Sequence, residues 1–138
     1  MAYTPPDAAT CASMIAQVRF NDDGLIAAIA QQHDTGEVLM LAWMNAAALG
    51  ETLRTGRVCY FSRSRQALWR KGETSGQVQT LVDARLDCDR DAVLVLVDQK
   101  GVACHTGRRS CFFNAMRPEG LVVISQPQIS ADELYKHG

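Results

Sequence analysis

The sequence lacks the features of a membrane-spanning or exported chain. No stretch approaches about 18 uninterrupted apolar residues, and the N-terminal segment has no cationic stretch followed by an apolar run. No charge of one sign dominates either: 14 basic and 15 acidic side chains leave a formal net charge of -1. No global field therefore attracts nucleic acid or an anionic membrane, so any phosphate binding must be local. We expect a cytoplasmic protein without a nucleic-acid or membrane partner.

Repeats and low-complexity segments are also absent. The 138 residues, with 47% apolar and 21% charged side chains, are ordinary for one globular domain. We expect a single domain over residues 1–138, with a loose lead-in at 1–12 and a C-terminal extension at 114–138. In that extension only a weak capping box at Ser130 and Glu133 predicts a short helix.

The order of apolar runs and turn residues predicts a β-rich α+β fold with two β-hairpins and a few short helices. Runs at 25–30 and 38–43 flank a turn at 33–36 and predict the first hairpin. Asn45 and Gly56 delimit a predicted helix at 46–54. Strands are expected at 58–61 and 77–82, with a glycine-rich loop at 71–76 between them. A strand at 92–97, a turn at 98–101 and a return strand at 102–105 predict the second hairpin.

Five cysteines form an odd set, which in a reducing compartment favours metal binding or catalysis over disulfides. Cys104 and Cys111 flank a glycine turn across which two thiols can converge, and Cys88 lies upstream. Three cysteines without an obvious fourth protein ligand describe a zinc site with a position open for water, which is typical of catalytic zinc. Buried reduced thiols are the alternative.

Three aspartates surround the first of these cysteines, at Asp87, Asp89 and Asp91. If this segment is extended, the carboxylates share one face and Cys88 the other. Hard oxygen ligands suit Mg²⁺ or Ca²⁺. A calcium loop of the EF-hand type is excluded because Ala92 stands where that loop requires glycine. A solvated acidic strand entry is the alternative.

His105 adjoins Cys104 and, in extended backbone, points away from it. It is therefore better placed as an acid or base than as a metal ligand, since histidine ordinarily exchanges protons near neutral pH. A structural histidine is the alternative.

A polar segment between the predicted strands carries the groups that bind a phosphate ester: hydroxyls, guanidinium forks and free backbone N–H groups. No dinucleotide fingerprint or phosphate loop of the strand-to-helix type is present, so this would be an unrelated cradle. An ordinary polar surface loop is the alternative. The candidate substrate-binding residues are Ser62, Arg63, Ser64, Arg65, Trp69, Lys71, Gly72, Thr74 and Ser75.

Taken together, the sequence blocks at 38–45, 62–65, 68–76, 87–91, 103–107 and 110–112 resemble the phosphoribosyl-AMP cyclohydrolase family, in its monofunctional form. The resemblance covers residues 36–112. It implies zinc, one ion per subunit, on Cys88, Cys104 and Cys111, and magnesium on Asp87, Asp89 and Asp91.

The resemblance also implies an intertwined homodimer with the zinc at the subunit interface, where the first cysteine and the later pair come from different chains. The implied reaction is attack of zinc-bound hydroxide on C6 of the N1-phosphoribosyl adenine of phosphoribosyl-AMP, with His105 moving protons. This opens the N1–C6 bond in the third step of histidine biosynthesis. Because the sequence ends at Gly138, the pyrophosphohydrolase domain of some relatives is expected to be absent.

Two other functions compete with this interpretation. A zinc nucleobase deaminase attacks the same kind of carbon, but its His-x-Glu and Cys-x-x-Cys signatures do not occur in the sequence. A small zinc-stabilised module that binds RNA or phosphorylated ligands would use Arg63 and Arg65 as its contact surface. A zinc ion held entirely by protein ligands would favour that module, and an open zinc site with turnover would favour the hydrolase.

Overall fold

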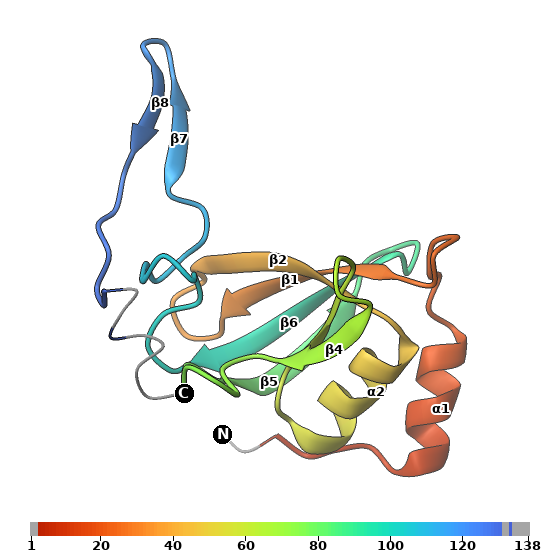
Figure 1. Ribbon diagram of the computed structural model, residues 1–138. Helices are drawn as coiled ribbons and strands as arrows, with labels where there is room; N and C mark the ends of the chain where they lie inside the picture. Colours follow the sequence, from red (N-terminus) through yellow and green to blue (C-terminus); the bar gives the residue numbers. More distant parts are fainter. Residues whose placement is uncertain (1–2, 131–132, 134–138) are drawn as a thin grey trace.

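A computed structural model describes residues 3–130 and residue 133 (Figure 1). Its centre is a four-stranded sheet in the order β2-β1-β6-β5. The strands are β1 (Ile26–Gln32), β2 (Val38–Met44), β5 (Gln79–Leu86) and β6 (Ala92–Gln99). β1 pairs with β2 antiparallel and with β6 parallel, and β5 pairs with β6 antiparallel. The predicted β-rich α+β class is confirmed.

The first predicted hairpin is confirmed as β1 and β2. Burial alternates along β1, with Ile26, Ala28, Ala30 and Gln32 directed into the core. The same alternation in β6 buries Val93, Val95, Val97 and Gln99. Because successive side chains of a strand point to opposite faces, every second residue of β1 and β6 lies on the same face of the sheet, and that face is buried in the core.

The second predicted hairpin has the wrong partner. β6 pairs with the preceding strand β5, not with residues 102–105, which form no strand. Both edges of β6 are already occupied, by β1 and β5, so a return strand has no hydrogen-bonding edge to join. At Gly101 the backbone adopts φ +66°, and the chain leaves the sheet there.

The predicted central helix is confirmed as α2 (Ala46–Thr55). The Asn45 side chain accepts a hydrogen bond from the backbone N–H of Ala48 at 2.8 Å, and Gly56 ends the helix at φ +72°. Leu49 and Leu53 lie on the buried face. A two-stranded sheet of β3 (Cys59–Ser62) and β4 (Ala67–Arg70) follows, of which only β3 was predicted.

The lead-in predicted at residues 1–12 contains the start of a helix, α1 (Ala8–Ala16). Asp7 caps it by accepting from the backbone N–H of Thr10 at 2.7 Å, and Cys11 is buried in the core. α1 packs on α2. The sequence of α1 shows no helical periodicity of large apolar residues. Only one of its side chains, that of Cys11, is fully buried, so its packing leaves no such pattern in the sequence.

Beyond residue 113 the chain forms a hairpin that the sequence did not predict, from β7 (Asn114–Arg117) and β8 (Gly120–Val123). We call it the arm. The predicted capping contact exists, since the backbone N–H of Glu133 donates to Ser130 Oγ at 3.1 Å, but most of the helix expected there lies outside the described residues.

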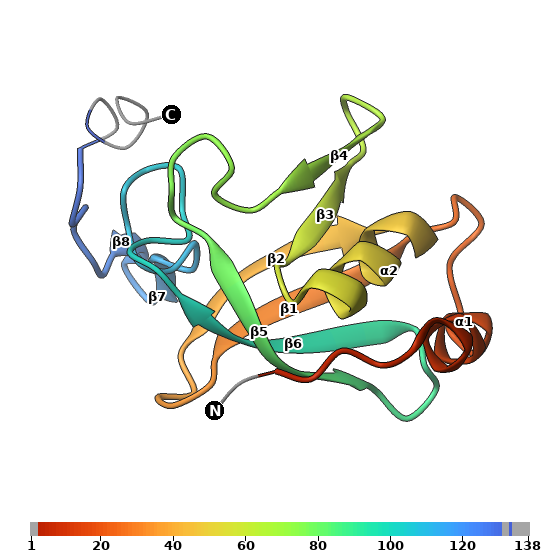
Figure 2. The ribbon, with the colours of Figure 1, turned by 90° about the horizontal axis from the view of Figure 1, so that it is seen from below.

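The two faces of the central sheet differ. α2 and the β3–β4 hairpin cover one face, while the arm rises at one end on the opposite side (Figures 1 and 2). No described helix is long and apolar enough to cross a bilayer.

Candidate active site

The predicted metal ligands lie at the two ends of β6. Asp87, Cys88 and the other aspartates form the turn that enters the strand, and Cys104 and Cys111 belong to the loop that leaves it. β6 has eight residues, which at the usual rise span about 25 Å. The structure therefore brings the later two cysteines together and leaves Cys88 away from them.

The three aspartates converge, although not in the way predicted. The segment is a tight turn rather than extended backbone, with Arg90 at φ +64°. The carboxylate of Asp87 accepts hydrogen bonds from the backbone N–H groups of Asp91 at 3.0 Å and Ala92 at 3.3 Å. One oxygen from each of Asp87, Asp89 and Asp91 lies within 4.8 Å of the others. The turn, and not alternation along a strand, produces the cluster.

The chemistry of this cluster fits a hard cation. Its carboxylates are exposed. The pKa of Asp91 is raised. The main cause is a hydrogen bond with the Asp89 carboxyl, followed by desolvation and by the negative charges of Asp89 and Asp87. A divalent cation would relieve this repulsion, and exposed carboxylates leave room for the water ligands that Mg²⁺ retains.

The loop that carries Cys104 and Cys111 is closed by a hydrogen bond within it and anchored to β2 by a second. The backbone N–H of Cys104 donates to the carbonyl of Arg108 at 3.1 Å, and that of Cys111 donates to the Leu39 carbonyl at 2.7 Å. Gly107 turns the chain at φ +85°, where a Cβ would clash with the carbonyl of Ile129. The loop thus holds the two cysteines across the glycine turn, as predicted.

The two thiols are electrostatically unequal neighbours. Burial, then the adjacent Cys104, raise the pKa of Cys111 to about 12. Burial also opposes the thiolate of Cys104, but hydrogen bonds from Thr106 and Cys111 lower its pKa overall. The Thr106 hydroxyl lies 3.1 Å from Cys104 Sγ. A paired set of thiol donors, one of which already favours the thiolate, fits a soft cation such as zinc.

A cavity of about 190 Å³ lies over this pair. His105 is exposed at its wall, and Lys71 reaches it from the loop after β4. Lys71 Nζ donates to the carbonyl of Ala103 at 2.6 Å, and burial lowers the pKa of Lys71. Sequence reasoning missed Met40 and Gln77, which also line this cavity. Gln77 adjoins the glycine-rich block, whereas no local signal marks Met40.

A second hollow, of about 440 Å³, adjoins the first and shares Trp69, Lys71 and Ser75 with it. It contains the predicted substrate-binding residues Arg65, Gly72 and Thr74. Other predicted residues lie elsewhere: the Arg63 guanidinium stacks 4.9 Å from the centre of the Trp43 ring. The hydroxyls of Ser62 and Ser64 are 3.4 Å apart at the exposed β3–β4 turn.

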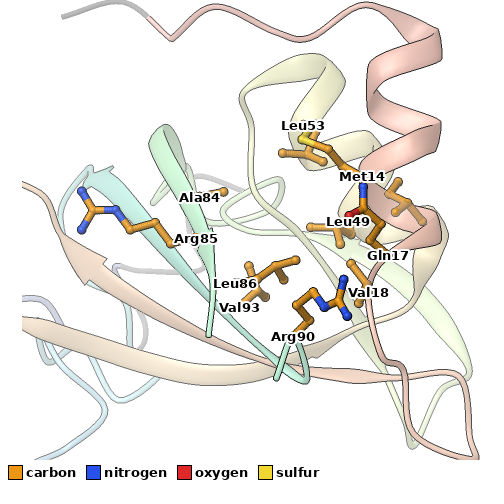
Figure 3. A pocket seen from close by; sticks show the side chains of 11 residues that line it. Met14, Gln17, Val18, Leu49, Leu53, Ala84, Arg85, Leu86, Arg90 and Val93 are labelled. Atoms are coloured by element: carbon orange, nitrogen blue, oxygen red, sulfur yellow. The ribbon is translucent and has the colours of Figure 1, made fainter. Parts of the chain in front are cut away.

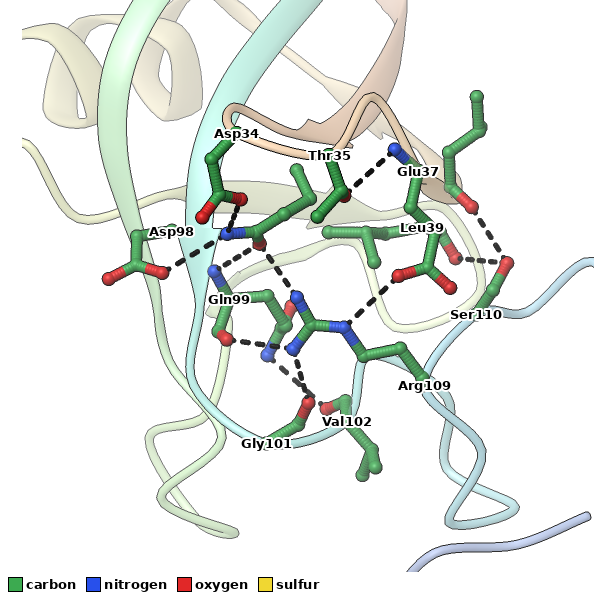
Figure 4. A network of polar contacts seen from close by, with 12 residues as sticks. Asp34, Thr35, Glu37, Leu39, Asp98, Gln99, Gly101, Val102, Arg109 and Ser110 are labelled. Atoms are coloured by element: carbon green, nitrogen blue, oxygen red, sulfur yellow. Dashed lines mark hydrogen bonds and ion pairs between the residues drawn. The ribbon is translucent and has the colours of Figure 1, made fainter.

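Arg109, to which the sequence analysis gave no role, anchors the cysteine loop (Figure 4). Its guanidinium donates to the carbonyls of Gln99 at 2.9 Å and Gly101 at 2.7 Å, and to the Gln32 side chain at 2.8 Å. Its Nε meets Glu37 at 3.3 Å. This network fixes the loop to the end of the sheet, and at the buried Gln99 it satisfies a carbonyl that would otherwise be costly to bury.

Comparison with known proteins identifies the family of the chain. The family described as phosphoribosyl-AMP cyclohydrolase matches residues 40–113. A phosphoribosyl-AMP cyclohydrolase of Paramagnetospirillum magneticum is 67% identical over 91% of this chain and 95% of its own. The enzyme of the same name from Gluconobacter oxydans is 68% identical over 96% of this chain and 85% of its own. That of Granulibacter bethesdensis is 71% identical over 86% of this chain and 93% of its own. The matched segment contains both candidate metal sites and the loops that line the two hollows. The chain belongs to the phosphoribosyl-AMP cyclohydrolase family, a family of hydrolases.

Proposed function

We propose that the protein hydrolyses phosphoribosyl-AMP in histidine biosynthesis, by opening the adenine ring between N1 and C6. The observation that carries this proposal is the cavity in which the Cys104–Cys111 pair, His105 and Lys71 meet beside a hollow equipped for phosphate. The names of the similar proteins agree with it. The use of free thiols as ligands suits the reducing cytoplasm.

Two residues of one subunit, Cys104 and Cys111, would hold the zinc together with Cys88 of the partner subunit. The distance between the two ends of β6 supports this division, because Cys88 of the same chain lies at the far end of that strand. Zinc held by these three cysteines would supply a water ligand whose pKa is lowered toward about 7. Asp87, Asp89 and Asp91 would hold magnesium.

The protein's own groups then orient the substrate and move protons. The N1-ribosyl group makes the ring amidinium-like, so C6 accepts the oxygen of water. Cleavage of N1–C6 follows, N1 takes up a proton, and C6 keeps its amino group as a carboxamide. His105, exposed at the cavity wall, accepts the proton of the attacking water and returns one to N1. Arg65, Lys71 and the Thr74 and Ser75 hydroxyls bind phosphate in the adjoining hollow.

Substrate choice tests the proposal. An N1-substituted adenine has an activated C6, while AMP keeps an aromatic ring that resists attack. With zinc and magnesium present, ultraviolet absorbance should report ring opening of phosphoribosyl-AMP and no reaction of AMP or ATP. Ammonia released from AMP would instead show a deaminase.

His105→Asn should reduce kcat by roughly 100-fold or more while the zinc content stays unchanged, because the variant loses proton transfer and not a metal ligand. Turnover and bound metal are measured on the same preparation. His33→Asn is the matched control, since His33 is exposed in the β1–β2 turn, outside both hollows. A near-normal rate across the pH range would make His105 a structural residue.

A further inference from the structure

Lys71 places a half-buried cation beside the cysteine pair of the active-site cavity. Its Nζ donates to the carbonyl of Ala103, the residue before Cys104, at 2.6 Å. Burial lowers the pKa of Lys71, while the charges of Cys111 and then Cys104 act in the opposite direction. The ammonium therefore lies close enough to both sulfurs for their charges to act on it.

The position of this ammonium is fixed by buried parts of the fold. The backbone N–H of Lys71 donates to the carbonyl of buried Val58 at 3.1 Å. Two residues earlier, the Trp69 ring packs on buried Tyr60, with the ring centres 5.0 Å apart. Lys71 Nζ lies 6.0 Å from the centre of the Trp69 ring. These contacts hold the positive charge at one place relative to the cysteine loop, as a group that tunes a metal site must be held.

Among the described residues, Lys71 forms no ion pair with a carboxylate. Basic side chains beside another hollow are placed differently. Arg85 and Arg90 border an apolar hollow of about 280 Å³ between α1, α2 and the β5–β6 hairpin (Figure 3), and both are exposed to water. Arg85 also pairs with Asp83 at 3.0 Å. Lys71 is more buried than either arginine, and a cation that is buried without an anion is costly.

The anions that can offset this cost are the thiolates of the cysteine pair. Cysteine binds zinc in its thiolate form. A site of three cysteines therefore carries one more negative charge than Zn²⁺ neutralises. The charge of Lys71 is opposite in sign to this excess and lies in the same cavity, where the attraction between charges is stronger than in bulk water.

We infer that Lys71 is the counter-charge of the zinc-binding cysteines: its ammonium offsets the excess negative charge of the thiolates, holds the backbone next to Cys104, and so strengthens zinc binding. This inference rests on the proposed zinc site. Lys71 acts here as a positioning residue. An ammonium has three N–H donors and the Ala103 carbonyl uses one, so two remain for the phosphate contact in the adjoining hollow.

Zinc affinity, measured on the full-length chain without substrate by competition with a chelator, tests the inference. Lys71→Gln keeps an N–H donor and loses the charge, and it should raise the dissociation constant for zinc by about 10- to 100-fold, as is typical of groups that support metal ligands. Lys71→Arg keeps the charge and should recover most of the lost affinity. Lys100→Gln is the matched control: it removes the same charge from an exposed side chain outside the cavity, where water and salt screen it.

Thermal unfolding of the same proteins separates the effect of the charge from a defect in folding. A purely structural role predicts that Lys71→Gln lowers Tm equally with and without zinc. The counter-charge role predicts that the Tm of the zinc-free protein changes little, whereas the rise in Tm on adding zinc becomes smaller, because that rise depends on the zinc affinity.

Wild-type zinc affinity in Lys71→Gln would overturn the inference, and a raised KM alone would then assign Lys71 to phosphate binding. Equal losses of affinity in Lys71→Gln and Lys71→Arg would also contradict it, because the charge would not be the cause. A wild-type protein that binds no zinc would refute the proposed metal site itself, and the inference with it.

Discussion

Replacing Cys104 with serine is expected to remove zinc and to reduce turnover of phosphoribosyl-AMP by at least about 100-fold. Removing a group that only supports a metal ligand typically lowers metal affinity or activity by about 10- to 100-fold. Loss of a thiolate ligand itself should therefore lower activity by at least about 100-fold. The Cys104 side chain is buried, at 4% exposure, beside Cys111. Its hydrogen bond with Thr106 favours the thiolate form. A serine hydroxyl stays protonated at neutral pH and cannot replace that thiolate as a ligand.

Metal content and ultraviolet turnover are measured together on the purified variant. Cys11→Ala is the matched control: Cys11 is also buried, at 5% exposure, but it packs in α1 among core residues away from the cavity. It should keep its full zinc content. If Cys104→Ser retained both zinc and activity, the assignment of the metal to this loop would be wrong.

The parts of the fold that the sequence predicted are those with local causes. Asn45 and Gly56 cap α2 within its own sequence, and the turn at 33–36 joins two runs that pair with each other. The partners of β6 were not local: β1 lies more than 60 residues away in sequence and pairs in parallel, which no turn signal indicates. The arm was missed because its exposed apolar residues, such as Met116, make no pattern of burial within one chain.

The site shows the same division. The glycine turn at Gly107 indicated that Cys104 and Cys111 could converge, and it holds them as predicted. The clustering of the aspartates was right and its cause wrong, because the positive φ of Arg90 was not apparent from residue type. Arg109 was missed since its partners, the Gln99 carbonyl and the Gln32 side chain, come together only when the sheet has formed.

The separation of Cys88 from the other two cysteines is the feature on which the proposed active site depends most. One chain supplies a pair of thiols at one end of β6 and a single thiol at the other. A three-thiol site is therefore complete only if two subunits combine, and each dimer then contains two such sites related by symmetry.

Mixing two inactive variants measures this directly. Cys88→Ser and Cys111→Ser each lack one ligand at every site of their own homodimers. In a heterodimer, the intact pair of the first variant meets the intact Cys88 of the second, so one site of two is restored. Random refolding together should recover about a quarter of wild-type activity, because half of the dimers are mixed and each has one complete site. Purified heterodimers, verified by mass, that bind no zinc and show no turnover would contradict a site shared between subunits.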